Sequence, residues 1–188
     1  MNPLYERFPE SVNVGGEEYR IYTDFREFLR LLDILKSDDD EMIASEILSM
    51  YQDRIPKDYK KAILAIADFV SGEENTDVEN DNEEETKQKK LISYEKDAPY
   101  IIGDFLRYYN INLMTCRYLH WKEFQILLEG LPEDSEIKKR IGYRAMNPDK
   151  RKNKEERSRI IKIQKMISID DEEVDAERIG DLFGGQME

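Results

Sequence analysis

Apolar side chains recur at intervals of three and four residues through most of this 188-residue chain, and this spacing constrains its fold more than any other feature. Such spacing places the apolar residues on one face of an α-helix. Capping residues, Gly and Pro divide the pattern into short segments. The sequence therefore predicts a mainly α fold of six to seven short helices, over residues 24–36, 41–53, 57–71, 96–109, 119–129, 135–145 and 152–168.

The first third of the chain also predicts a small N-terminal β-hairpin. Residues 11–14 and 17–22 flank Gly15-Gly16, and glycine accepts the positive φ angles of a tight two-residue turn. Thr23 is predicted to cap the first helix. The inward-facing residues predicted for the first three helices are Phe25, Phe28, Leu29, Leu32, Leu35, Ile43, Ile47, Met50, Tyr59, Ile63, Ile66 and Val70.

Changes in composition predict the domain organisation. Residues 1–72 hold the hairpin and three helices, and 91–169 form an aromatic-rich helical region with a basic last helix. Between them, residues 73–90 read as an acidic flexible linker, because 73–85 contain eight acids and no base. Residues 170–188 read as an acidic flexible tail. We expect residues 1–169 to form one packed unit.

The stretch from 91 to 131 concentrates large rings. It contains eight of the 19 aromatic residues of the chain and its only Trp, His and Cys. Helical spacing favours a hydrophobic core for these rings, but short helices cannot cover every amphipathic ring. We therefore expect some of them to bind a partner at the surface. The candidate partner-binding residues are Tyr100, Phe105, Tyr108, Tyr109, Tyr118, Trp121 and Phe124.

The sequence offers few candidates for catalysis, and the expectation is a protein that is not an enzyme. His120, between Leu119 and Trp121, is better explained as a packed or interface histidine than as a general base. Cys116 and His120 form an i, i+4 pair on a predicted helix, but no orienting third group is evident. A single Cys excludes an intrachain disulfide.

No cofactor or metal is predicted. One Cys and one His fall short of a structural zinc site. Asp77, Glu79 and Asp81 alternate as calcium ligands do, but Gln88 stands where the bidentate Glu belongs, so a solvated acidic segment explains them better. Neither GxxxxGK[ST] nor GxGxxG occurs. Without a long apolar run or a signal peptide, the sequence predicts a soluble cytosolic protein with no membrane contact.

The formal net charge of −13 hides a basic block, since residues 137–165 contain twelve bases and three acids. By charge alone this block is a candidate for binding nucleic acid. Aromatic residues do not alternate with the bases, as they do on single-strand stacking surfaces. A solvated helix face or a protein-docking patch is therefore favoured over nucleic acid. The bases considered are Arg140, Arg144, Lys150, Arg151, Lys152, Lys154, Arg157, Arg159, Lys162 and Lys165.

Several short motifs, in their order along the chain, resemble the bacteriophage gene-product-fifteen family. They are VNVGGEEY at 12–19, TDFR at 23–26, YEKD at 94–97, YI at 100–101, YNI at 109–111, LHW at 119–121, Phe124, GLP at 130–132 and GYR at 142–144. The resemblance covers the chain to about residue 169. The sequence departs from the family at Lys122, where a second aromatic residue often follows His-Trp.

The resemblance implies a function in assembling phage tails. The family is encoded between the major tail protein and the tape-measure protein, the position of tail assembly chaperones. Such a protein would bind the long apolar tape-measure protein in the host cytoplasm until tail-tube subunits polymerise around it, and would be absent from the mature virion. The tape-measure protein, the major tail (tube) protein, a second copy or a companion chaperone are the implied partners.

Two other functions stay open from the sequence. One is a structural tail or neck component, which would be found stoichiometrically in purified particles. The other is a nucleic-acid-binding regulatory protein that uses the bases between Lys138 and Lys165, whose retention on DNA would depend steeply on salt.

Overall fold

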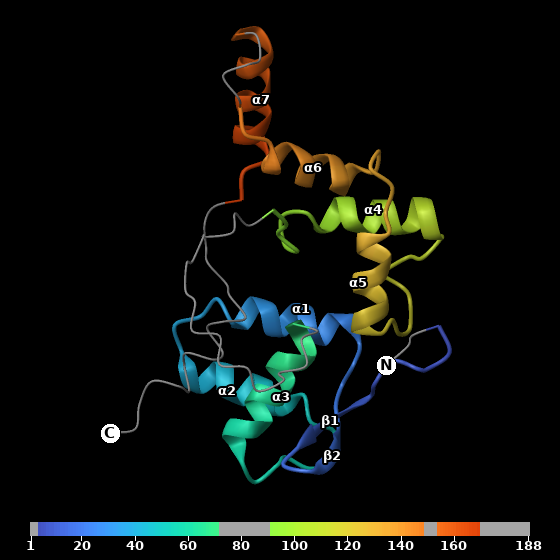
Figure 1. The fold of residues 1–188 in the computed structure, drawn as a ribbon, viewed down its shortest axis with the longest axis vertical. Coiled ribbons are helices and arrows are strands. Elements are labelled where there is room, and N and C mark those ends of the chain that lie inside the picture. Colours follow the sequence, from blue (N-terminus) through green and yellow to red (C-terminus); the bar gives the residue numbers. More distant parts are fainter. Residues whose placement is uncertain (1–3, 72–90, 149–153, 170–188) are drawn as a thin grey trace. The chain divides into compact units, whose positions relative to one another are not determined.

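A computed structural model describes residues 4–71, 91–148 and 154–169 of the chain (Figure 1). The predicted linker (73–90) and tail (170–188), with the calcium candidates Asp77, Glu79 and Asp81, lie outside the described residues. Within the described part the fold is mainly α with a two-stranded antiparallel hairpin, which confirms the predicted fold class. The elements are β1 (Ser11–Val14), β2 (Glu17–Arg20), α1 (Phe25–Ile34), α2 (Asp40–Ser49), α3 (Tyr59–Ser71), α4 (Ala98–Tyr109), α5 (Trp121–Glu129), α6 (Glu136–Ala145) and α7 (Lys154–Met166).

The chain divides into two compact units, which are described separately below. Unit 1 contains the hairpin, α1, α2, α3 and residues 118–124, and unit 2 contains residues 91–117, 125–148 and 154–169 among the described residues. The first turn of α5 therefore belongs to unit 1 and the remainder of that helix to unit 2. The packing of residues 1–169 as one unit stays a prediction.

The hairpin forms as predicted. Gly15 and Gly16 have φ angles of 63° and 89°, which side chains with a Cβ rarely adopt. The Asn13 carboxamide oxygen accepts a hydrogen bond from the N–H of Gly16 at 2.9 Å and braces the turn. Val12 and Val14 are buried, and β1 packs against α3, so the hairpin closes one side of the unit 1 core.

Helix α1 buries a stripe that is centred differently from the prediction. Its N-cap is Asp24, not Thr23, because the Asp24 carboxylate accepts from the N–H of Arg26 at 3.0 Å. Phe25, Phe28 and Leu35 are buried as predicted, together with Leu31. Leu29 and Leu32, predicted to face inward, are only half-buried. Leu29, Leu31 and Leu32 are spread over about 160° of the helix at 100° per residue, so spacing alone does not show which of them lies at the centre of the buried stripe.

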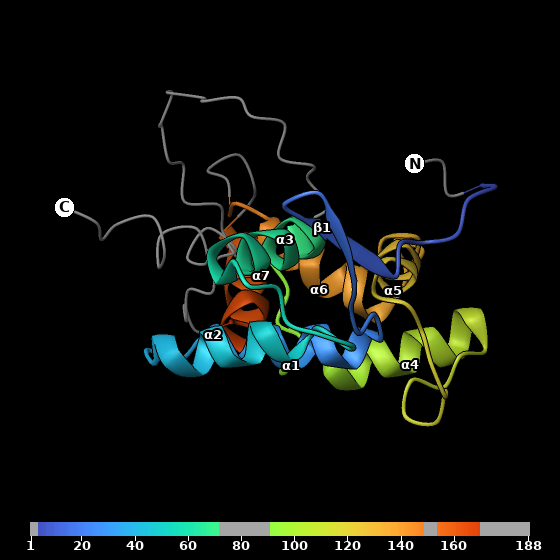
Figure 2. The ribbon, with the colours of Figure 1, turned by 90° about the horizontal axis from the view of Figure 1, so that it is seen from below.

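Helices α2 and α3 complete unit 1, and Figures 1 and 2 show α3 beside α2. The predicted inward residues of these helices are buried, with one exception. Tyr59 is 60% exposed because α3 begins at Tyr59 and its first turn faces solvent. Tyr51 takes the inward place instead and donates its hydroxyl to the Ala62 carbonyl at 2.7 Å.

Unit 2 is built on α4, α6 and α7. Helix α4 ends at Asn110, whose φ of 56° is left-handed, as predicted. Helices α4 and α6 pack together, and α6 contacts α7. Ile160 of α7 is buried, while Ile163 and Ile167, which follows the end of the helix, are half-buried, so the helix docks along the predicted apolar seam.

Candidate partner-binding site

The segment before α5 crosses the start of α1 and is held there by its backbone. The N–H of Phe25 donates to the Leu119 carbonyl at 2.9 Å, and the N–H of Trp121 donates to the Thr23 carbonyl at 2.8 Å. Between these two bonds, the Asp24 carboxylate accepts from the N–H of Leu119 at 3.3 Å. Residues almost one hundred positions apart thus pair as a short bridge, which brings the LHW motif into unit 1.

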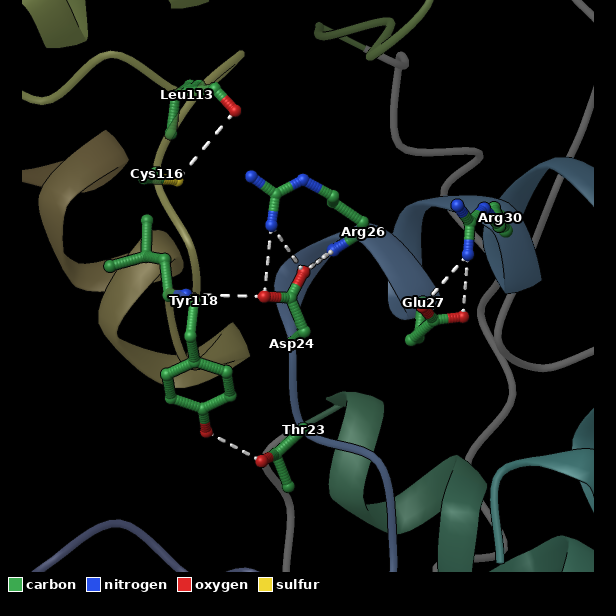
Figure 3. A network of polar contacts seen from close by, with 9 residues as sticks. Thr23, Asp24, Arg26, Glu27, Arg30, Leu113, Cys116 and Tyr118 are labelled. Atoms are coloured by element: carbon green, nitrogen blue, oxygen red, sulfur yellow. Dashed lines mark hydrogen bonds and ion pairs between the residues drawn. The ribbon is translucent and has the colours of Figure 1, made fainter.

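Side chains reinforce this crossing at its rim. The hydroxyls of Tyr118 and Thr23 are 2.7 Å apart, and Arg26 pairs with the Asp24 carboxylate at 3.0 Å (Figure 3). The hydroxyl of Thr23 is therefore engaged with Tyr118 rather than with the helix end that it was predicted to cap. The side chain of Tyr118 stays 53% exposed, so it is anchored at one end and open to solvent over its ring.

The crossing places two of the predicted partner-binding rings inside a stack of aromatic residues. Trp121 stacks on Phe28 with 5.3 Å between ring centroids, and Phe124 stacks on Phe25 at 4.9 Å. Trp121 and Phe124 are each only 1% exposed. Aromatic pairs in such contact bury large areas and contribute beyond that burial. In this conformation both rings are packed inside unit 1, where they form part of its core.

His120 is packed at the edge of the same stack. Its ring lies parallel to Phe8 at 5.1 Å, Nδ1 accepts from the N–H of Lys122 at 3.1 Å, and Nε2 lies 3.0 Å from the Pro9 carbonyl. A carbonyl only accepts, so Nε2 carries the proton and the ring is neutral. Burial lowers the pKa of His120 below its ordinary value. Cys116, its predicted helical neighbour, lies before α5 and belongs to unit 2.

The buried neutral His120 predicts that unit 1 loses stability in weak acid. The unfolded chain takes up a proton near pH 6.5, whereas the folded ring resists it, so the free energy of unfolding should fall as pH drops from 7 toward 5. Urea denaturation across this range measures the effect. His120→Gln should flatten the profile in this window, because the chain has one His. Equal slopes in both proteins would contradict the assignment.

Unit 2 is organised by a buried ion pair that sequence patterns did not indicate. The guanidinium of Arg144 on α6 forms two hydrogen bonds with the Asp97 carboxylate before α4, at 2.6 and 2.8 Å. It also donates to the carbonyls of Leu91 and Ile167, at 2.9 and 2.8 Å. Asp97 is fully buried and Arg144 is 4% exposed. One side chain of α6 thus ties the segment that precedes α4 to the residue that follows α7.

A second buried acid joins α4 to α6. The carboxylate of Asp104 accepts from the N–H of Ile137 at 2.8 Å and from that of Glu136 at 3.3 Å, so it satisfies two free donors at the start of α6. A carboxylate at a helix N-terminus is also favoured by the helix dipole. The only sequence signal for this role was an acid on the otherwise apolar stripe of α4.

The outward side of α4 is uncharged and partly exposed. Helix α4 contains two charged residues, and of these Asp104 is buried while Arg107 lies beside the face described here. At 100° per residue, one side of the helix presents what we call the α4 outer face. It consists of Pro99, Ile102, Gly103, Leu106 and Tyr109. Leu106 is 48% exposed, and a Cβ built on Gly103 would meet nothing within 4 Å.

The seven predicted partner-binding residues therefore lie in different surroundings. Phe105, Trp121 and Phe124 are in cores, and Tyr118 is exposed on unit 1. Tyr100, Tyr108 and Tyr109 are half-buried on α4, where Tyr109 donates its hydroxyl to the Leu127 carbonyl at 2.8 Å. The predicted residues are all aromatic, whereas the most exposed apolar residues of α4 are aliphatic. The sequence feature that could have indicated these aliphatic residues is the lack of charge on one side of the helix. Binding of a partner by the seven stays a prediction.

The predicted basic block is only partly a surface. Arg144 is buried in its ion pair, so its prediction as part of a basic surface is wrong, and Arg140 lies half-buried over the Tyr100 ring at 3.5 Å. Lys150, Arg151 and Lys152 lie outside the described residues. The exposed bases of the described block are concentrated on α7: Lys154, Arg157, Arg159, Lys162 and Lys165.

The described residues supply neither a metal centre nor a membrane span. No three His, Cys, Asp or Glu side chains in this part of the chain are grouped to hold a metal ion. None of the helices described here combines the length and apolar character needed to cross a bilayer.

The described residues form a mainly α-helical protein in which the α4 outer face is an uncharged, partly exposed helix surface. Residues 4–169 match the family model described as Bacteriophage Gp15 protein. The match covers most of the chain, so the chain belongs to this family, and the resemblance seen in the sequence is confirmed. No curated protein and no solved structure matches the chain.

Proposed function

We propose that this protein is a tail assembly chaperone that binds the tape-measure protein and keeps it soluble until tail-tube subunits polymerise around it. The observation that carries the proposal is the α4 outer face, an uncharged helix surface in a chain of which 38% of residues are charged. Membership of a phage protein family supports it. Exposed apolar surface of this kind is typical of sites that bind another protein.

The spacing of the α4 outer face suits an amphipathic partner helix. Pro99, Ile102, Gly103 and Leu106 follow the i, i+3, i+4, i+7 pattern by which one helix presents a stripe to another. The twelve residues of α4 extend about 18 Å, which is roughly three turns of a partner. Gly103 has open space above it, so a partner backbone can approach closely there.

The remaining properties of the chain support binding without chemistry. His120 has both ring nitrogens engaged, and Cys116 is not placed beside it on a helix. The net charge of −13 would keep a tape-measure protein that is covered by copies of this chain from aggregating. We therefore propose a non-enzymatic protein of the host cytoplasm that leaves the tail before the virion is complete, with the tail-tube protein as its second partner.

The proposal is tested by co-expression with the tape-measure protein. The wild-type chain should raise the soluble fraction of the tape-measure protein, and Leu106→Lys should abolish most of that effect. Burying one leucine contributes about 1.5–3 kcal/mol, so its loss should weaken binding by roughly tenfold to a hundredfold. The soluble fraction after centrifugation, and the Kd for a purified tape-measure segment, are the measurements.

Ile55→Lys is the matched control, because Ile55 in unit 1 is 52% exposed and undergoes the same change of charge. It should keep full activity. If Leu106→Lys remains folded and solubilises the tape-measure protein as well as Ile55→Lys does, the α4 outer face is not the binding surface. If the wild-type chain has no effect and is found stoichiometrically in purified particles, the protein is a structural tail component instead.

A further inference from the structure

The outward side of α7 is a basic surface with an apolar centre. Helix α7 carries five bases and two acids, and its seam toward α6 contains the buried Ile160. Ile161, about 100° farther round the helix, is 45% exposed. At 100° per residue, the neighbours of Ile161 on that side are mostly bases. We call this side the α7 basic face, and it consists of Lys154, Arg157, Ser158, Ile161, Lys162 and Lys165.

Unit 1 of the same chain carries a surface of opposite charge. Residues 38–41 at the start of α2 are four consecutive acids, and all four are exposed. We call them the acidic corner. Met42 follows directly and is 45% exposed. The corner thus offers negative charge beside one apolar side chain, the complement of the α7 basic face.

We propose that the α7 basic face docks the acidic corner of a second copy of this chain. Opposite charges over several residues steer association, and Ile161 against Met42 would add apolar contact. A nucleic acid is the poorer occupant, because the face has an exposed aliphatic centre and α7 has no aromatic ring on which a base could stack. The proposal concerns the protein alone and does not depend on the tape-measure protein.

The two surfaces are different, so the contact is heterologous. A heterologous contact leaves one free face and one free corner on every pair, and further copies add head to tail until a ring closes or a chain extends. Self-association through charge also predicts strong sensitivity to salt, because the Debye length falls to about 3 Å at 1 M.

Light scattering coupled to size exclusion tests the proposal with the full chain. At low salt the mass should exceed the 22.3 kDa of one chain and rise with concentration, and at about 1 M salt it should return to one chain. Lys162→Glu/Lys165→Glu and, separately, Asp40→Lys/Glu41→Lys should each remain monomeric. Circular dichroism confirms that each variant is folded.

Mixing the two variants is the sharpest measurement. In an equimolar mixture the intact corner of one variant can meet the intact face of the other, so the mixture should associate although neither variant does so alone. Lys57→Glu/Lys60→Glu is the control, because it changes the net charge as much as Lys162→Glu/Lys165→Glu does, at exposed positions outside the α7 basic face and the acidic corner. It should assemble like the wild type. The proposal is overturned if the wild type is monomeric at low salt or if the mixture does not pair. A salt-dependent change of radius at constant mass also overturns it, because the corner would then be reached within one chain.

Discussion

Replacing Arg144 with methionine should lower the free energy of unfolding by about 3–5 kcal/mol, because the fully buried Asp97 carboxylate loses its nearest cation and two hydrogen bonds. Removing one partner of a buried pair costs far more than the pair contributes, since the remaining charge has no water to solvate it. The carbonyls of Leu91 and Ile167 also lose their donor. Urea denaturation followed by circular dichroism measures the change.

Arg140→Met is the matched control for that substitution. The Arg140 guanidinium lies 4.0 Å from the Asp97 carboxylate and is partly exposed, so its loss should cost about 1 kcal/mol or less. Adding Asp97→Leu to Arg144→Met should recover part of the stability, because the double variant no longer buries an unpaired charge. Equal losses for Arg140→Met and Arg144→Met would show that the ion pair does not hold unit 2 together.

Trp121→Ala should destabilise unit 1 by about 3–5 kcal/mol, the usual result of emptying a large buried aromatic site. Trp121 is 1% exposed and stacks on both Phe28 and Phe124, so the cavity would open in the middle of the aromatic stack. Denaturation followed by far-ultraviolet circular dichroism is the measurement, because the substitution removes the only Trp and its fluorescence.

Tyr118→Phe provides the comparison on the same segment. It removes only the hydroxyl contact with Thr23, and should cost about 0.5–1.5 kcal/mol. A small loss for Trp121→Ala would mean that its ring is available to a partner after all. A large loss would mean that weaker binding of the tape-measure protein by this variant results from unfolding and not from a missing contact. Substitution of Leu106 is therefore the better test of the binding surface.

Local features of the sequence were sufficient to predict most elements. The Gly15-Gly16 turn, the stop at Asn110 and the apolar repeats of α2, α4 and α5 each depend on residues within one or two turns of one another. Helix ends were less accurate, and α2 ends at Ser49 rather than near residue 53. The segment that follows pairs instead with the end of the hairpin, where the N–H of Tyr22 donates to the Met50 carbonyl at 2.8 Å.

The candidate site was harder to predict because ring content alone does not distinguish a core from a surface. Trp121 and Phe124 read as binding residues, but the crossing of the LHW motif over α1 buries them. Leu106 and Gly103 carry no unusual signal one by one. They became a candidate surface only when the structure showed which side of α4 its neighbours leave uncovered.

The sequence by itself determined the fold class, the hairpin and the family. Helical periodicity and turn chemistry depend on residues close together in the chain, and the order of the motifs is visible without a structure. Only the tertiary structure decided that Arg144 is a buried partner of Asp97 rather than part of a basic surface, and that residues 118–124 belong with unit 1. Both depend on contacts between residues some 47 to 95 positions apart. Charge and hydrophobicity along a chain do not specify which distant groups meet.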